Sequence, residues 1–339
     1  MIRVAVHYWE NDPFSLMIYR ENVLAYLPED VIVLPFIGDE SPDGSADLIW
    51  EPGLAGSRMP PDYLLRVRCP VVATIHGAAP FVLPFRENYA SVLSGLRGLM
   101  ENRKCLHRWN KVRKKISSVI AVSQYGAYEV ASVFNLNQKI VQPIYHGVDH
   151  SVFFPGGDIE SYTKPYFLLV CQYQPKKNVD RVLSAFESIE SKSKPDLVAI
   201  IPGYKGRKSY PGVHIIREKM DQVALAKWYR GALAFVFPSL HETFGMPIIE
   251  AMACGCPVIT SNSSACKEIA GEAAMLVDPR DEKSIATSIF QLSNYPDIAI
   301  DLREKGLKRA EQFTWQCSAE EHLAQFRKAI IKFQTGFSK

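Results

Sequence analysis

Short apolar runs alternate with longer amphipathic stretches along the chain. In the first half the runs cover residues 4–8, 31–36, 71–75, 119–122 and 140–145. Such alternation predicts βαβ units and a mainly parallel sheet, because each parallel strand needs a crossover, usually a helix, to reach the next. A cluster of chain breakers at 153–158, Phe-Phe-Pro-Gly-Gly-Asp, then interrupts the rhythm and indicates a domain boundary.

The rhythm of apolar runs starts again after this boundary, at residues 166–170, 197–201, 213–216, 233–237 and 258–260. We therefore expect two doubly wound α/β domains, over 1–157 and 158–314, with ligands bound in the loops at the carboxyl ends of the strands. From Trp315 onward, apolar residues at helical spacing predict a final helix, over 315–339, that covers a domain face.

Composition agrees with two domains and excludes some classes of partner. A chain of 339 residues with 47% hydrophobic residues exceeds what one compact core usually holds. The net charge of +3 is too small for a protein that coats nucleic acid, so we expect no nucleic-acid partner. Seven cysteines without a CxxC pair favour reduced thiols and no metal site.

The start of the chain bears on localisation. Its first residues enter a strand pattern directly and reach the charged Glu10 and Asp12 without the apolar region of a signal peptide. No run of about 18 apolar residues follows, so no helix is expected to span a membrane. We expect a cytoplasmic protein, at most peripheral on the inner face of the membrane.

Residues 237–260 read as strand, loop, helix and strand, and they carry the strongest chemical signal. Pro247 suits a first helical turn, so the helix should start near Gly245 and present its amides and positive end to an anion. Glu242 lies in the loop before this helix, and Glu250 lies within it. Taken singly, the two glutamates could simply favour the positive helix end and stay solvated.

The full string from Glu242, Glu-Thr-Phe-Gly-Met-Pro-Ile-Ile-Glu-Ala-Met-Ala, resembles the signature of glycosyltransferase family 4. The resemblance extends over most of the chain and is strongest at 166–281. It implies the GT-B fold: two Rossmann-like domains that face each other across a cleft, with a C-terminal helix crossing back to the first domain. It also implies a retaining, metal-independent hexosyltransferase that uses a nucleotide-diphosphate sugar as donor and needs no cofactor.

The resemblance assigns roles to residues of the helix and its loop. Glu250 would hold the ribose hydroxyls, because a carboxylate can accept two hydrogen bonds from a vicinal diol. Glu242 would hold hydroxyls of the donor sugar. The amides of Phe244, Gly245 and Met246 would contact the same sugar or its phosphate.

Cations must neutralise the leaving diphosphate when no metal does so. The loop after the first strand of the second domain contains Lys176 and Lys177 and looks like the family's diphosphate loop, so Lys177 is the expected contact. Many relatives have Arg where this chain has Gln172, so Lys176 or Arg181 would substitute, or the phosphate is held less tightly. Gly203, after the next strand, is a further candidate donor contact.

Two features of the first domain resemble acceptor and donor contacts. His76, in Thr-Ile-His-Gly, resembles the family's histidine site and would contact the donor sugar or phosphate, although a lone histidine is often structural. The first loop lacks the glycines of many relatives. In this loop Trp9 and Phe14 could form a stacking platform for an acceptor sugar, or could simply lie at the edge of the hydrophobic core.

Residues 97–115 hold eight basic residues against one acid, Glu101. Apolar residues lie between the basic ones, which favours a pair of basic amphipathic helices that sit on an anionic membrane surface. The alternative is an ordinary solvated helix face. Relatives often use this region on anionic lipid, which fits a lipid-linked acceptor.

Several rival functions share paired α/β domains. A nicotinamide dehydrogenase would need a Gly-x-Gly-x-x-Gly after the opening strand, and none is present. A sugar phosphorylase, a nucleotide-sugar epimerase and a scaffold that has lost its chemistry stay open. Within the transferases, the Lys-Lys-Asn loop resembles that of some mannosyltransferases, which favours GDP-mannose as donor, with UDP-hexoses close behind. The resemblance to the family also implies a glycan or lipid-linked acceptor in cell-surface polysaccharide or glycolipid synthesis.

Overall fold

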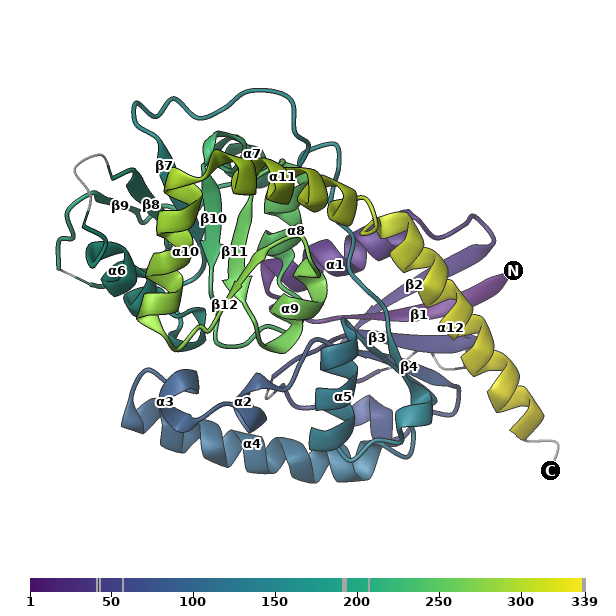
Figure 1. Ribbon diagram of the computed structural model, residues 1–339. Coiled ribbons are helices and arrows are strands. Elements are labelled where there is room, and N and C mark those ends of the chain that lie inside the picture. The colour runs from purple at the N-terminus through teal and green to yellow at the C-terminus, as the bar shows by residue number, and fades with distance from the viewer. Residues whose placement is uncertain (41, 43, 57, 191–193, 207, 337–339) are drawn as a thin grey trace. The chain divides into compact units, whose positions relative to one another are not determined.

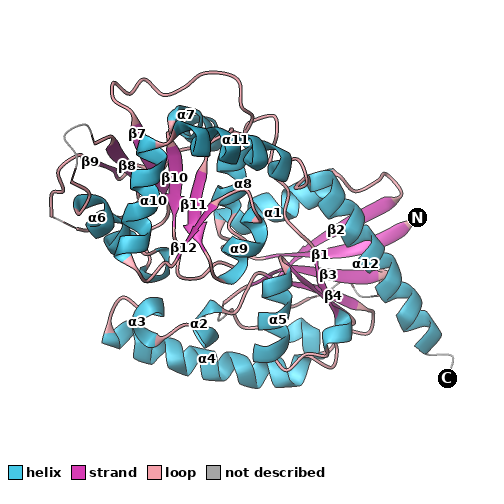
Figure 2. Ribbon diagram, viewed as in Figure 1, coloured by secondary structure: helices cyan, strands magenta, loops and turns pink. Residues whose placement is uncertain are grey.

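The computed structural model describes residues 1–40, 42, 44–56, 58–190, 194–206 and 208–336. The chain forms two compact units. Unit 1 comprises Met1–Leu83, Ser91–Gly147 and Thr314–Lys339, and unit 2 comprises Pro84–Ala90 and Val148–Phe313. Each unit has its own six-stranded sheet with helices around it (Figures 1 and 2).

The sheet of unit 1 has the order β2-β1-β3-β4-β5-β6, and all its neighbouring strands pair in parallel. Its strands are β1 (Ile2–Tyr8), β2 (Val31–Ile37), β3 (Leu48–Leu54), β4 (Val71–Ile75), β5 (Ser118–Ala121) and β6 (Val141–Pro143). Its helices are α1 (Phe14–Ala25), η1 (Asp62–Leu65), α2 (Ala79–Val82), α4 (Val92–Val112), α5 (Gln124–Val133), η2 (Gln138–Ile140) and α12 (Trp315–Gly336).

The sheet of unit 2 has the order β12-β11-β10-β7-β8-β9 and is also parallel throughout. Its strands are β7 (Tyr166–Val170), β8 (Asp196–Ile200), β9 (Val213–Ile216), β10 (Ala234–Phe237), β11 (Val258–Ser261) and β12 (Met275–Val277). Its helices are α3 (Phe85–Asn88), η3 (Pro175–Lys177), α6 (Val179–Glu187), α7 (Gln222–Gly231), α8 (Met246–Ala253), α9 (Ser264–Ala270), α10 (Glu282–Asn294) and α11 (Pro296–Ala310).

Helix α12 lies against α1, β3 and β4 of unit 1, as Figure 1 shows. Its buried face carries Trp315, His322 and Phe326, three large rings at helical spacing. The chain changes unit at 147/148, earlier than the breaker cluster at 153–158. Gly147 allows this passage, since a Cβ there would lie 2.1 Å from the backbone nitrogen of Trp315.

Strand β3 has no counterpart among the apolar runs of the sequence. It is buried along its whole length between β1 and β4, yet its second half contains Glu51, Pro52 and Gly53. These three residue types are depleted in strands, so the sequence pattern hides a central strand. The short edge strand β12, Met-Leu-Val, is likewise absent from the expected apolar runs.

The basic segment forms one helix and not the expected pair. Helix α4 runs unbroken from Val92 to Val112 and starts at a capping box made by Ser91 and Ser94. Gly95 and Gly98 lie on its buried face, so these glycines serve close packing and do not break the helix. The segment 84–90 before α4 clusters with unit 2, where Glu87 accepts two hydrogen bonds from Arg280, at 2.9 and 2.6 Å.

Candidate active site

Lys177 and Glu242 meet at the carboxyl ends of two neighbouring parallel strands of unit 2. Lys177 ends η3, in the loop after β7, and Glu242 lies in the loop after β10, the strand that pairs with β7. The Lys177 Nζ atom lies 2.5 Å from Glu242 Oε1. The two side chains are only 16% and 11% exposed, so the ion pair is largely desolvated.

The charges of this pair stabilise each other. Burial alone would raise the pKa of Glu242, but the charges of Lys177 and Lys176 and hydrogen bonds from Lys177 and Ser239 outweigh it, so the pKa is lowered. Burial alone would lower the pKa of Lys177, and Glu242 reverses that effect, so the pKa is raised. Both groups are therefore ionised at neutral pH.

Asn178 ties the Lys177 loop to its surroundings. It adopts the left-handed conformation at φ 62°, and its side-chain amide donates to the carbonyls of Pro238 at 2.9 Å and Pro279 at 2.6 Å. Arg181 contacts Asn178 Oδ1 and the Pro279 carbonyl. Arg181 is thus engaged in holding loops together.

A second loop fixes the backbone of Glu242. The Glu242 amide donates to Ser264 Oγ at 3.1 Å, and the Glu242 carbonyl accepts from the Ala265 amide at 3.2 Å. Ser264, at the start of α9, has a positive φ of 54°. The sequence pattern did not single out Ser264, because its role depends on a contact between loops 22 positions apart.

Helix α8 starts where the sequence predicts. Gly245 is its N-cap at φ 100°, a conformation that favours glycine, and Pro247 lies in its first turn. Ile248 and Ile249 are fully buried and anchor the helix to unit 2. The positive end of α8 therefore follows directly on the loop that holds Glu242.

Glu250 lies in the second turn of α8 and faces Tyr229 of α7, whose hydroxyl donates to Glu250 Oε2 at 3.5 Å. Burial raises the pKa of Glu250 to about 7, and the hydrogen bond from Tyr229 offsets only part of that effect. The carboxyl is therefore close to half ionised at neutral pH. Tyr229 was not predicted from the sequence, since it lies 21 positions away on another helix.

Of the remaining donor candidates of unit 2, Gln172 and Gly203 lie at exposed loop positions, whereas Phe244 is buried. Gln172 is exposed and accepts a hydrogen bond from Gln174 at 3.2 Å. Gly203 follows β8 with a φ of 78°, and no heavy atom would lie within 4 Å of a Cβ there. Phe244 is buried and packs edge-on against Phe313, with ring centroids 5.8 Å apart.

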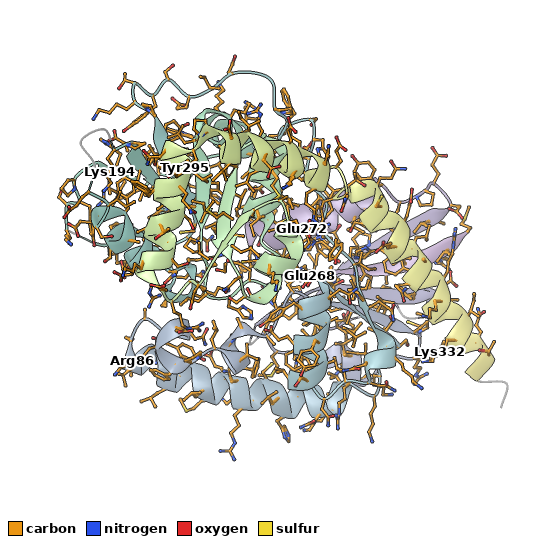
Figure 3. All side chains as sticks on the ribbon, viewed as in Figure 1. Arg86, Lys194, Glu268, Glu272, Tyr295 and Lys332 are labelled. Atoms are coloured by element: carbon orange, nitrogen blue, oxygen red, sulfur yellow. The ribbon has the colours of Figure 1, made fainter. Side chains whose placement is uncertain are left out.

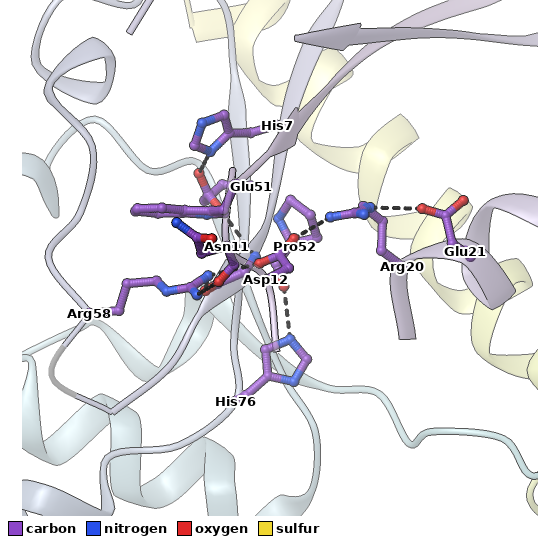
Figure 4. Close-up of polar contacts among 11 residues, drawn as sticks. His7, Asn11, Asp12, Arg20, Glu21, Glu51, Pro52, Arg58 and His76 are labelled. Atoms are coloured by element: carbon purple, nitrogen blue, oxygen red, sulfur yellow. Dashed lines mark hydrogen bonds and ion pairs between the residues drawn. The ribbon is translucent and has the colours of Figure 1, made fainter. Parts of the chain in front are cut away.

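His76 lies in unit 1, at the carboxyl end of β4. Its Nε2 lies 2.8 Å from the Pro52 carbonyl, so Nε2–H donates, as Figure 4 shows. Burial lowers the pKa of His76 to about 4, so the ring is neutral at pH 7. Tyr19 packs edge-on against it at 4.6 Å, and His146 stacks on it at 5.7 Å.

Glu51 organises the first loop of unit 1 and was missed by the sequence analysis. Its buried carboxylate lies 2.5 Å from His7 Nδ1, as Figure 4 shows. It also accepts hydrogen bonds from Trp9 Nε1 at 3.0 Å and the Tyr63 hydroxyl at 2.8 Å. The only local signal is the apolar triplet before it, at 48–50. No periodicity indicates that the strand continues through a glutamate.

The two aromatic residues of the first loop differ in their surroundings. Trp9 is half-buried, hydrogen-bonded to Glu51 and covered by the guanidinium of Arg58 at 4.4 Å. It lines a pocket of about 540 Å³ together with His7 and Arg108. Phe14, at the start of α1, is 55% exposed and does not line that pocket.

Two properties of the described residues concern metal ions and membranes. Within the part of the chain that the structure describes, no three His, Cys, Asp or Glu side chains are grouped so that they could hold a metal ion. None of the described helices combines the length and the apolar character needed to cross a membrane.

The fold of the chain matches that of solved structures. Sucrose-phosphate synthase from Thermosynechococcus elongatus superposes with a TM-score of 0.73 at 18% identity, over 97% of this chain and 99% of that one. HepE from Anabaena, solved in complex with UDP, gives a TM-score of 0.71 at 13% identity, over 97% and 100%. These likenesses confirm the expected GT-B class of two Rossmann-like α/β units.

Relatives in sequence are glycosyltransferases. The O-antigen chain mannosyltransferase B of Escherichia coli is 29% identical over 169 residues, which cover 44% of this chain and 42% of that protein. The MMP alpha-(1->4)-mannosyltransferase of Mycolicibacterium hassiacum is 25% identical over 286 residues, 78% of this chain and 66% of that protein. The chain thus spans about half the length of the curated relatives it matches.

The family match falls on the unit that contains the Lys177–Glu242 pair. The model described as "Glycosyl transferases group 1" matches residues 158–311, which take in both loops of the pair, helix α8 and Glu250. The match to the group 1 glycosyltransferase model therefore covers nearly the whole of unit 2.

Proposed function

We propose that the protein is a retaining hexosyltransferase that moves a sugar from a nucleotide-diphosphate donor to a glycan or lipid-linked acceptor. The observation that carries this proposal is the buried Lys177–Glu242 pair beside the N-terminus of α8, within the family-matched segment. A cation, a carboxylate and a positive helix end then converge at the carboxyl edge of one sheet, where α/β domains bind phosphorylated ligands.

The leaving group is the diphosphate of the donor. Its growing negative charge is stabilised by Lys177, by Lys176 and by the backbone amides around Gly245, with no metal ion required. Lys177 must therefore exchange part of its attraction to Glu242 for the phosphate when the donor binds. Glu242 is then available to accept hydrogen bonds from the sugar hydroxyls.

The two glutamates serve binding and not covalent catalysis in this mechanism. Glu250 accepts hydrogen bonds from the ribose, while Glu242 contacts the sugar, so neither is a nucleophile of the kind that retaining hydrolases use. The departing phosphate stabilises an oxocarbenium-like transition state on the face of the sugar that it leaves. The acceptor attacks from that same face, so the product keeps the anomeric configuration of the donor. Neutral His76 supplies a further polar contact to the donor sugar or its phosphate.

The identity of the donor rests on relatives. The mannosyltransferases among the sequence relatives support GDP-mannose. HepE solved with UDP-glucose, a structural neighbour at 14% identity, supports the alternative of a UDP-hexose. O-antigen chain relatives also support a role in cell-surface polysaccharide or glycolipid synthesis.

The acceptor and the membrane are proposed to meet unit 1. Helix α4 exposes Leu96, Leu99 and Met100 at 55%, 50% and 61%, next to its exposed basic residues. An exposed apolar and basic helix face fits the surface of an anionic membrane. Residues 97–115 would thus hold the protein on the inner face of the membrane, on the cytoplasmic side, near a lipid-linked acceptor.

The experiment that tests the proposed function measures nucleoside diphosphate release with GDP-mannose and with UDP-glucose, with and without a panel of lipid-linked and soluble glycan acceptors. We expect acceptor-dependent release, and a product whose anomeric configuration, read by proton NMR, matches that of the donor. Phosphate-dependent cleavage would indicate a phosphorylase, and donor isomerisation without acceptor an epimerase. A glycosyl adduct on Glu242 in mass spectra would contradict the mechanism.

A further inference from the structure

A second pocket in unit 1 lies at the opposite end of the sheet from His76. It has a volume of about 620 Å³ and is bounded by residues 67–69, by residues 114–117 and by the last turns of α12. The first two segments immediately precede β4 and β5, which pair in parallel, so the pocket lies at the amino ends of these strands. Val71 and Ser117 hydrogen-bond to each other there and tie the two segments together.

The charge of this pocket has one sign. Four basic side chains line it and no acidic one does: Arg68, Lys114, Lys115 and Lys332. All four are exposed, and Figure 3 shows Lys332 near the C-terminal end of α12. Four basic side chains on one pocket give it a positive potential, which favours an anionic ligand.

Helix ends account for only half of these charges. Lys114 and Lys115 follow the C-terminus of α4, whose carbonyls favour basic residues. Arg68 lies in a turn before β4, and Lys332 lies inside α12 and not in its last turn. Arg68 and Lys332 complement no helix end, so helix dipoles do not account for the whole basic lining of the pocket.

The inner wall of the pocket is apolar. Val67 and Ile116 are 6% and 5% exposed, and Phe333 of α12 is half-buried beside them. A free inorganic anion would gain no binding free energy from such a wall. An anion with an attached hydrocarbon chain would gain it, because the chain and the wall would remove each other's apolar surface from water.

We propose that this pocket binds a phosphate-bearing lipid, with the phosphate among Arg68, Lys114, Lys115 and Lys332 and the start of an acyl chain against Val67, Ile116 and Phe333. The site is separate from the proposed transfer reaction and does not depend on it. It also differs from the α4 surface, because it offers a discrete pocket to a single lipid.

Two cysteines of unit 1 allow a direct test on the full chain. Cys69 lines the pocket and is half-buried, whereas Cys317 is exposed at the other end of α12. Alkylation of both by iodoacetamide is followed by peptide mass spectrometry. We expect dihexanoyl phosphatidate, a lipid short enough to stay monomeric, to slow alkylation of Cys69 at least about five-fold while the rate at Cys317 stays unchanged.

Two matched double variants locate the binding. Arg68→Ser with Lys332→Ser removes the two charges that helix ends do not explain, and should weaken protection of Cys69 at least about ten-fold, because each basic residue beside anionic lipid is worth on the order of a five-fold change in affinity. Arg3→Ser with Lys139→Ser removes one exposed arginine and one exposed lysine of unit 1 away from the pocket, and should leave protection unchanged.

Four outcomes would overturn the proposal. They are no protection by the phosphatidate, equal protection by inorganic phosphate, equal protection by dihexanoyl phosphatidylcholine, and protection that persists in Arg68→Ser with Lys332→Ser. Protection of the buried Cys105 from alkylation reports whether unit 1 of each variant is folded. Should the double variant unfold, Lys332→Ser alone, on the solvent side of α12, gives the same comparison.

Discussion

Lys177 and Glu242 are 65 positions apart in the chain and form an ion pair of 2.5 Å inside unit 2. Each lies in a loop that follows a strand of the same parallel sheet, and Asn178 and Ser264 hold the two loops in place. The pair is therefore a product of sheet topology.

Removing Lys177 should destabilise the fold as well as abolish activity. Lys177→Ala leaves the carboxylate of Glu242 buried without its partner, which should cost about 3 kcal/mol in the free energy of unfolding. Lys177→Met combined with Glu242→Gln removes both charges and should recover most of that loss, measured by urea denaturation, without recovering turnover. Full activity in the double variant would contradict the proposed roles.

Glu250→Ala should weaken donor binding. Loss of a charge-assisted contact to the ribose should raise the donor KM and cost about 2–4 kcal/mol in kcat/KM. Titration calorimetry with the nucleoside diphosphate checks the assignment. Donor affinity equal to that of the unchanged protein would exclude a ribose contact by Glu250.

Donor affinity should depend on pH through Glu250. Burial raises its pKa to about 7, and hydroxyl donors bind the ionised form. Below this pKa, Glu250 must lose its proton before the donor can bind, so donor affinity should increase by up to about ten-fold per pH unit as pH rises from 6. Above the pKa, Glu250 is already ionised, so affinity should level off towards pH 8. Glu250→Gln should flatten this profile. A profile that persists in Glu250→Gln would assign the pH dependence to another group.

Chelation should leave turnover intact. Since Lys177, Lys176 and helix amides are proposed to stabilise the leaving diphosphate, EDTA should not lower the rate of nucleoside diphosphate release. A rate that falls with EDTA and returns with Mg²⁺ would show that a metal ion takes part.

The exposed basic residues of α4 should carry membrane binding. Replacing Arg97, Arg103, Lys104 and Lys111 with Ser should abolish sedimentation with anionic vesicles and spare turnover on a soluble acceptor, since each basic residue near such a surface contributes about 1 kcal/mol. Arg108 and Arg113 are left in place because they contact Asp62 and the Asn135 carbonyl.

A matched control for α4 replaces Arg3, Lys139, Lys283 and Lys308 with Ser, four exposed basic residues on other elements. This variant should sediment like the unchanged protein, and sedimentation of both should fade as salt is raised. Equal sedimentation of the α4 variant and its control would make α4 an ordinary solvated helix.

The sequence by itself determined most elements of the fold. The apolar runs at 71–75, 166–170 and 213–216 coincide with β4, β7 and β9. For β4 and β7 the reason is that a strand buried on both faces must be apolar along its length. Gly245 and Pro247 set the start of α8, since a left-handed N-cap and a first-turn proline are local requirements. The signature around Glu242 and Glu250 likewise identified the segment that the group 1 family model matches.

Only the tertiary structure decided which side chains meet. Glu51 is buried inside β3, a strand that is recognisable only from its position between β1 and β4. The burial of its carboxylate depends on contacts with His7, Trp9 and Tyr63. Tyr229 and burial set the pKa of Glu250 from a different helix. Local patterns encode propensity and periodicity, whereas partners and desolvation depend on contacts between segments far apart in the chain, which no window of sequence contains.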